Sequence, residues 1–356
     1  MKNLLHLAAP LHNVGDNALI LGVRQLFKED CKLHLRPLRS TVIDLRLINE
    51  INRNYDGLII GGGGLLHAPK SILDRKKDTS GTLIMMDTEN LKYLKKPLIV
   101  YGVGYNVFRG ENDLPKIAKE SILDMMNHAI HFSVRNDGSK KRLSKFLEID
   151  ESIINEVPDP GLYVKSKHGK LSKLVKNDKN IAIQIAADRL NHRFKNKDEV
   201  TKFIKNIKSF ILNNQEYTCW LVPHCPIDDD FIKLNFSGFR SIPLTLDLVE
   251  ATEVMGFYSK MDVVIGQRGH GNICPFGINV PVISLVSHDK NLGFMQDVGF
   301  NDYAVNASDS NLDKKLITLV KSIDSKYRKL QTEKIEKMKI SSNLIVDEIV
   351  KKIKKK

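Results

Sequence analysis

The segment from residue 261 to 286, MDVVIGQRGHGNICPFGINVPVISLV, constrains the fold more than any other part of the chain. Two short apolar runs, at 263–265 and 282–286, flank a polar turn and a short helical stretch. Strands joined by a helix of this length run parallel, so the segment predicts a βαβ unit. Ligands of open parallel sheets bind outside the carboxyl ends of the strands, where this strand leads into Arg268 and His270. These residues indicate an anion site, although a polar helix cap would use similar ones.

The same order of apolar strand, polar turn and helix recurs along the chain. The apolar patterns predict strands at 4–8, 33–38, 58–60, 97–101, 131–134, 181–186 and 219–223. Helices are expected at 18–27, 44–52, 83–94, 114–128, 140–146, 198–212, 246–259 and 292–298. A chain of 356 residues exceeds the size at which one core keeps growing. We therefore expect an α/β fold with two Rossmann-like domains facing a central cleft, a GT-B-like architecture.

The domain boundaries follow from composition. Residues 166–180 are polar and rich in lysine, with little to bury, and are the expected linker. They separate an N-terminal α/β domain, 1–165, expected on the acceptor side, from a C-terminal α/β domain, 181–325, expected on the donor side. Basic helices are expected to close the chain, the last being an amphipathic helix or tail over 326–356.

The charge balance favours anionic partners. The formal net charge is +13, from 55 basic and 42 acidic residues, with lysines concentrated at the C-terminal end. Such a chain suits phosphorylated ligands or anionic lipid, whereas the lysines are not interleaved with aromatic residues as in nucleic-acid-binding proteins. An apolar stripe near the end could lie on an anionic membrane or pack on the protein body: Leu344, Ile345, Ile349 and Ile353.

Cysteine usage and hydropathy predict the compartment. The four cysteines are widely spaced, with no CxxC pair and no metal-ligand spacing, which indicates reduced thiols. No apolar run has the length of a membrane span, and the first residues lack the pattern of a signal peptide. We therefore expect a cytoplasmic protein, with peripheral contact at the inner membrane face as a further expectation.

Three glycine- or asparagine-rich turns are candidate ligand contacts. Gly15, Asp16 and Asn17 open a helix, where free N–H groups attract anions, although Asp16 or Asn17 could simply cap that helix. Four glycines, 61–64, follow an apolar strand and suit close backbone approach to a ligand. They match neither a Walker loop nor a dinucleotide fingerprint. Asn106 follows a third glycine turn.

Taken in order, these motifs resemble one known family. The elements NVGDNALI, GGGGLL, YGVG, SVRNDGS, PDPGL and QRGHGNICPFGINVPVISL are similar to those of polysaccharide pyruvyl transferases, over roughly residues 8 to 300. Arg268 and His270 match the Arg-x-His element of the family, and Ser133 and Arg135 match its strand-end arginine motif. The resemblance implies transfer of pyruvate from phosphoenolpyruvate to a sugar, as a ketal, on a bacterial surface polysaccharide or its lipid-linked precursor.

The chemistry of that reaction assigns expected roles to individual residues. The donor carries a phosphate and a carboxylate, for which arginine forks are suited. Its expected contacts are Arg268, Arg135, Gly269, Gly271 and Asn272, with Arg189 in reserve. His270, then His224, is expected to move protons, and Asp16 or Asp159 to orient the acceptor hydroxyl. The expected acceptor contacts are Gly15, Asn17, Gly62, Gly63, Gly64 and Asn106. Neither a metal nor a cofactor is expected, and Asp228, Asp229 and Asp230 are expected to begin a helix.

Two alternatives stay open from the sequence. The segment from His270 to Asp289 is also similar to the nucleotide-sugar half-site of GT-B glycosyltransferases, and the glycines flanking His270 fit a close phosphate approach. This interpretation replaces phosphoenolpyruvate by a nucleotide-sugar. The second alternative is a non-catalytic protein that binds carbohydrate or a lipid surface.

Overall fold

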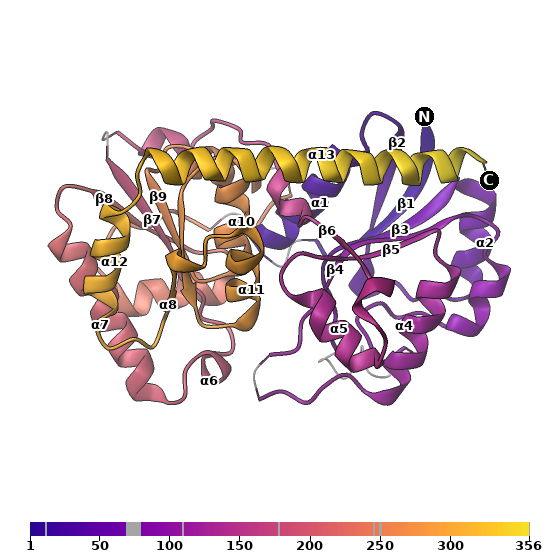
Figure 1. Ribbon diagram of the computed structural model, residues 1–356, viewed down its shortest axis with the longest axis horizontal. Coiled ribbons are helices and arrows are strands. Elements are labelled where there is room, and N and C mark those ends of the chain that lie inside the picture. The colour runs from indigo at the N-terminus through magenta and orange to yellow at the C-terminus, as the bar shows by residue number, and fades with distance from the viewer. Residues whose placement is uncertain are drawn as a thin grey trace.

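The protein consists of two α/β halves. The computed structural model describes residues 1–10, 13–68, 80–108, 110–176, 179–244, 246–248 and 251–355. Within these residues the chain forms two sheets, each made of parallel strands, one in each half of the molecule (Figure 1). The predicted α/β fold with two Rossmann-like halves is therefore confirmed.

The sheet of the N-terminal half has the strand order β2-β1-β3-β4-β5-β6. All neighbouring pairs are parallel. Its strands are β1 (Lys2–Ala8), β2 (Cys31–Pro37), β3 (Gly57–Leu66), β4 (Leu98–Tyr105), β5 (His131–Arg135) and β6 (Asn155–Val157). Its helices are α1 (Val14–Phe27), α2 (Leu45–Asn54), α4 (Lys116–His128) and α5 (Ser139–Leu147), and a 3₁₀ turn, η4 (Pro160–Tyr163), follows the last strand.

The sheet of the C-terminal half has the order β11-β10-β9-β7-β8, again with parallel neighbours. Its strands are β7 (Asn180–Gln184), β8 (Thr218–Val222), β9 (Val263–Gly266), β10 (Val282–Val286) and β11 (Ala304–Asn306). The helices are α6 (Leu190–Arg193), α7 (Lys197–Asn213), α8 (Pro226–Asn235), α9 (Ala251–Tyr258), α10 (Gly269–Gly277), α11 (Asp289–Val298), α12 (Leu312–Lys321) and α13 (Ser325–Lys355).

Helices of each half pack on the other half and fix their relative position. The first turn of α1 buries Val14 and Ala18 in the same hydrophobic cluster as Ile273 and Phe276 of α10. The long helix α13 runs along both halves (Figure 1). Its first part joins the C-terminal core through residues such as Ile335, and its last part joins a cluster with β1, α1 and β4.

The packing of α13 decides between the two interpretations of the C-terminal apolar stripe. Ile349 and Ile353 are each 1% exposed and contact the N-terminal core, so the stripe lies on the protein body rather than on a membrane. Leu344 points outward and is 60% exposed. In the part of the chain that the structure describes, no helix combines the length and the apolarity needed to cross a membrane.

The glycine-rich stretches are strands rather than turns, which corrects the sequence-based interpretation. Gly61 pairs with Tyr101 and Gly63 with Val103, so both stretches continue the parallel ladder between β3 and β4. The missing side chains leave room for η4 and α1, because a Cβ at Gly62 would lie 3.1 Å from the Pro160 side chain. These glycines therefore let neighbouring elements approach the sheet closely.

The helix predicted at 83–94 is wrong except for one short 3₁₀ element, η2 (Thr88–Tyr93). The backbone before it bonds to other segments instead of to itself: Leu83 N–H donates to His67, and Asp87 N–H donates to Ile43. The Ser80 hydroxyl also donates to the Ile84 carbonyl, at 2.7 Å. These partners compete with the hydrogen bonds of a helix.

The segment 166–180 carries more contacts than its composition indicates. Lys167 N–H donates to the carbonyl of Thr252 in the first turn of α9, Leu171 is buried, and Asn180 already begins β7. The division of the chain into 1–165, 166–180, 181–325 and 326–356 stays a prediction. The cysteines are free and buried: Cys31, Cys219, Cys225 and Cys274.

Candidate functional site

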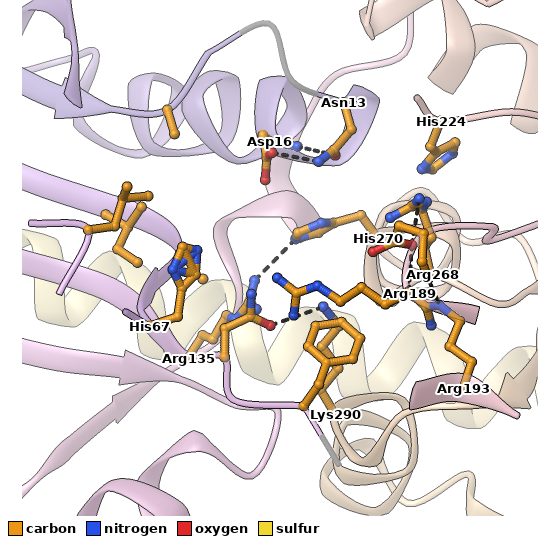
Figure 2. A pocket seen from close by; sticks show the side chains of 18 of the residues that line it. Asn13, Asp16, His67, Arg135, Arg189, Arg193, His224, Arg268, His270 and Lys290 are labelled. Atoms are coloured by element: carbon orange, nitrogen blue, oxygen red, sulfur yellow. Dashed lines mark hydrogen bonds and ion pairs between the residues drawn. The ribbon is translucent and has the colours of Figure 1, made fainter. Parts of the chain in front are cut away.

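A cavity of about 200 Å³ lies where the carboxyl ends of strands from both halves meet (Figure 2). Cationic and imidazole side chains dominate its lining, and Asp16 and Asp188 are the carboxylates in the wall. The other lining residues are Ala9, Asn13, Arg39, Gly64, Leu65, His67, Leu83, Asn106, Phe108, Arg135, Arg189, Arg193, His224, Arg268, Gly269, His270 and Lys290. Such a lining is suited to an anionic ligand.

Asp16 is held at the N-terminus of α1. The N-cap is Asn13, whose side-chain oxygen accepts from Asp16 N–H at 2.8 Å. Asn13 Nδ2 in turn donates to the Asp16 carboxylate at 2.5 Å. This reciprocal cap positions the carboxylate in the cavity wall, and Asn13 rather than Asp16 or Asn17 caps the helix.

Arg135 is a deeply buried cation of the site. It ends β5 and is 3% exposed. Its Nε lies 2.8 Å from Asp137 Oδ2 as an ion pair, and its Nη1 donates to Asp159 Oδ2 at 3.1 Å. Burial alone would lower the pKa of Arg135, but Asp137 and Asp159 outweigh it and raise that pKa. Gly104 leaves the space for this guanidinium, because a Cβ there would lie 2.6 Å from Arg135 Nε.

His270 lies between the two halves and contacts the Arg135 cluster. It belongs to the first turn of α10, and its Nε2 lies 3.5 Å from Asp159 Oδ2 and 3.4 Å from Arg135 Nη1. Burial would raise the pKa of Asp159, but His270 and Arg135 outweigh it and lower that pKa to about 2. Asp159 is therefore ionised at neutral pH.

Arg268 is bound to carboxylates of its own half. Its Nε and Nη2 donate to both oxygens of Asp228 at 2.7 Å, and Nη2 also lies 2.8 Å from Asp188. Burial would lower the pKa of Arg268, but Asp228 and Asp188 outweigh it and raise that pKa. Asp228 lies in the first turn of α8, so the three aspartates begin a helix as predicted. Arg268 thus adds positive charge to the wall, while its guanidinium is already paired with Asp228 and Asp188.

His224 is unsuited to donate a proton at neutral pH. The residue is completely buried at the end of β8, and its Nε2 lies 2.7 Å from the Tyr258 hydroxyl. Burial, reinforced by the nearby Arg268, lowers the pKa of His224 to about 3. The second-choice proton donor is therefore a neutral imidazole in the wall.

Several predicted contacts do not line the cavity, because packing within the protein occupies them. Asn17 donates to the Leu246 carbonyl, and Asn272 donates to Ser284 and to the Gly266 carbonyl. Gly271 is packed against Gln184. The predicted residues outside the lining are Gly15, Asn17, Gly62, Gly63, Asp159, Gly271 and Asn272. Those that line the cavity are Asp16, Gly64, Asn106, Arg135, Arg189, His224, Arg268, Gly269 and His270.

Gly15 supports the site through His270 rather than through a ligand. A Cβ at Gly15 would lie 2.4 Å from His270 Nδ1, so Gly15→Ala is expected to displace the imidazole and reduce turnover. A double-mutant cycle with His270→Ala measures the effect. If alanine at position 15 acts through the imidazole, it adds little in the His270→Ala background. Additive losses would show that Gly15 acts independently of His270.

Sequence reasoning missed other residues of the wall. Lys290 and Asp188 follow β10 and β7 at the carboxyl edge of the sheet, so their position after a strand was the available signal. Phe108 carries no polar signal, and the Arg189 guanidinium lies 4.0 Å from its ring centroid. Arg39, His67 and Arg193 also line the cavity. Among the described residues, no group of three or more His, Cys, Asp or Glu side chains is arranged to hold a metal ion.

Comparison with known proteins identifies a sequence family. The sequence model of the family described as polysaccharide pyruvyl transferase matches residues 11–289. No curated protein matches the chain by sequence.

Solved structures with a similar fold include sugar-nucleotide enzymes. UDP-GlcNAc 2-epimerase from Neisseria meningitidis, bound to UDP-GlcNAc, has a TM-score of 0.59 at 13% identity, covering 99% of this chain and 100% of the other. A putative UDP-N-acetylglucosamine 2-epimerase from Listeria monocytogenes has a TM-score of 0.57 at 13% identity, covering 95% and 90%. The Anabaena protein Alr3699/HepE, in complex with UDP and glucose, has a TM-score of 0.56 at 10% identity, covering 99% and 100%. At such identities the likeness shows the GT-B-like fold alone.

Proposed function

Because the chain belongs to the polysaccharide pyruvyl transferase family, we propose that it transfers pyruvate from phosphoenolpyruvate to a sugar of a bacterial surface polysaccharide or its lipid-linked precursor. The product is a cyclic ketal on two sugar hydroxyls. The lipid-linked form of the acceptor, a cytoplasmic location and contact with an anionic membrane belong to the same proposal. The lysines at the end of α13 are consistent with such a membrane contact.

The arrangement of charge in the cavity is the observation that carries this proposal. Asp137, Asp159 and Asp228 are each at most 2% exposed and lie behind the arginines that they hold. The cations therefore face the cavity. Their positive charge complements a donor that carries a phosphate and a carboxylate. A volume of about 200 Å³ is smaller than the roughly 300–1,000 Å³ of typical sites for drug-sized ligands, which favours a small donor over a nucleotide-sugar.

The reaction needs one proton delivered and two removed. A proton is added to the methylene carbon of phosphoenolpyruvate, and the first sugar hydroxyl attacks the adjacent carbon and loses its proton. The C–O bond to phosphate then breaks, and the second hydroxyl attacks the same carbon. Of the two hydroxyl protons, one replaces the proton given to the methylene and the other leaves with phosphate, so atoms and charges balance.

We assign the proton transfer to His270 and the orientation of the acceptor hydroxyl to Asp16. His270 has Asp159 beside it to stabilise the imidazolium, so it can hold the proton that the methylene carbon receives. Asp16 lies in the wall at the N-terminus of α1, on the half proposed for the acceptor. Arg135 lies within 3.4 Å of His270 and is assigned to the donor carboxylate.

A ligand panel tests the donor. We expect phosphoenolpyruvate to raise the melting temperature of the protein, whereas UDP, UDP-glucose and UDP-GlcNAc leave it unchanged at equal ionic strength. A ligand at a hundred times its dissociation constant adds about 2.7 kcal/mol to the free energy of unfolding. Stabilisation by the UDP ligands without any by phosphoenolpyruvate would contradict the proposal and support the nucleotide-sugar alternative. No response to any of them would count against both transferase functions.

A further inference from the structure

Phe108 is an apolar residue that lies among charged side chains of the opposite half. It follows β4 in the N-terminal half, lines the cavity and is 5% exposed. Groups of the C-terminal half surround its ring centroid: the His288 ring at 3.9 Å, the Arg189 guanidinium at 4.0 Å, and Arg193 and Lys290 at 5.5 Å each. The face of an aromatic ring attracts cations, whereas an aliphatic side chain would only fill the space.

The cations around this ring repel one another. Burial, reinforced by Arg135 and Arg193, lowers the pKa of Lys290 to about 7, against the smaller opposing effects of two aspartates. A group that attracts positive charge offsets such repulsion. The Phe108 ring does so without placing a negative charge in the cavity, where it would repel an anionic ligand.

One turn of the N-terminal half presents both Phe108 and Glu111 to Arg189. Glu111 N–H donates to the Phe108 carbonyl at 3.1 Å, and Phe108 N–H donates to the Glu111 carboxylate at 3.0 Å. Arg189 Nη1 donates to the same carboxylate at 3.3 Å. The guanidinium of Arg189 is therefore held by a ring and a carboxylate that both come from the other half.

The backbone of Arg189 also directs its side chain. The residue follows β7 and precedes α6, and its φ of 54° is in the left-handed region, which residues with a Cβ rarely adopt. Strained backbone of this kind concentrates at functional sites, where the surrounding contacts maintain it. Figure 2 shows the Arg189 side chain reaching into the cavity that it lines.

We propose that Phe108 is a positioning residue, which together with Glu111 holds the Arg189 guanidinium in the cavity wall to bind an anionic group of the ligand. The holding groups belong to one half and the arginine to the other, so the arginine is in place only when both halves meet. That the ligand is phosphoenolpyruvate rests on the proposed function, while the positioning of Arg189 does not.

Calorimetric titration of phosphoenolpyruvate and of inorganic phosphate tests the inference in a double-mutant cycle. Phe108→Leu keeps an apolar side chain without an aromatic face, and we expect it to weaken binding about 3- to 30-fold, from the usual strength of a cation–π pair. It is expected to add almost nothing in the Arg189→Gln background, because the group that it positions is then absent.

Further variants separate the positioning role from packing. Phe108→Tyr keeps the aromatic face and is expected to bind as the wild type does. Glu111→Gln removes only the charge of the carboxylate and is expected to weaken binding, again only where Arg189 is present. Tyr93→Leu is the control, because it removes an exposed ring that lies 5.3 Å from Lys92 Nζ on η2. It is expected to leave binding unchanged.

The outcomes separate the inference from the proposed function. Losses of phosphoenolpyruvate binding in Phe108→Leu that are equal with and without Arg189 would overturn the inference and leave the function standing. Losses as large in Phe108→Tyr would overturn it too. Binding of phosphate but not phosphoenolpyruvate, weakened by Phe108→Leu only beside Arg189, would overturn the function and support the inference. A wild type that binds neither would overturn both.

Discussion

Arg135→Met is expected to lower the free energy of unfolding by about 3–5 kcal/mol and to abolish binding of phosphoenolpyruvate. The arginine lies against Asp137 and Asp159, which are 2% and 0% exposed. Methionine fills much of the same space but removes the guanidinium that lies nearest to both buried carboxylates. Denaturant unfolding measures the stability, and calorimetric titration measures the binding.

Arg36→Met is the matched control for this effect. Arg36 also forms a two-pronged contact with a carboxylate, that of Glu50, but both side chains are 32% exposed. Solvent screens such a pair, so its loss is expected to cost at most about 1 kcal/mol. If the two variants lose similar stability, Arg135 does not compensate the buried carboxylates. If Arg135→Met binds phosphoenolpyruvate as the wild type does, the assignment of the donor carboxylate is wrong.

His270→Gln is expected to reduce turnover by about 10²- to 10⁴-fold while donor binding changes little. Glutamine keeps a polar side chain of similar reach next to Asp159 but does not exchange a proton near neutral pH. The measurement is phosphate released from phosphoenolpyruvate in the presence of a saccharide acceptor, with the donor affinity determined separately by calorimetry.

His34→Gln is the control for the histidine substitution, since His34 lies on β2 and hydrogen-bonds only weakly, to Asn3 at 3.2 Å. It is expected to leave turnover unchanged. If His270→Gln retains more than a tenth of the wild-type turnover, another group moves the proton. A large loss of donor affinity with unchanged turnover at saturation would instead make His270 a binding residue.

The sequence carried enough information for most of the fold. Apolar runs such as 263–265 and 282–286 are short and β-branched, so their period and length distinguish strands from helices. The errors occurred where distant partners decided the conformation. Gly61 and Gly63 look like a turn along the chain but pair with β4, and the segment at 83–87 bonds to residues near 43 and 67. Local patterns do not report such partners.

The candidate site was predictable to a lesser degree. Arg135, Arg268 and His270 follow strands, and the rule that ligands bind at the carboxyl ends of strands placed them at one edge. Which carboxylates pair with them was not predictable, because the two that hold Arg268 come from the loop after β7 and from the first turn of α8. Lys290 escaped notice because no motif marks it, and only the folded chain brings it into the cavity wall.

The crystal structure of the His270→Gln variant with phosphoenolpyruvate tests the account most directly. It should show the donor in the cavity between the two sheets, with its carboxylate at Arg135 and its methylene carbon facing residue 270. A donor bound elsewhere on the protein would contradict this account. So would a cavity that takes UDP but stays empty at saturating phosphoenolpyruvate.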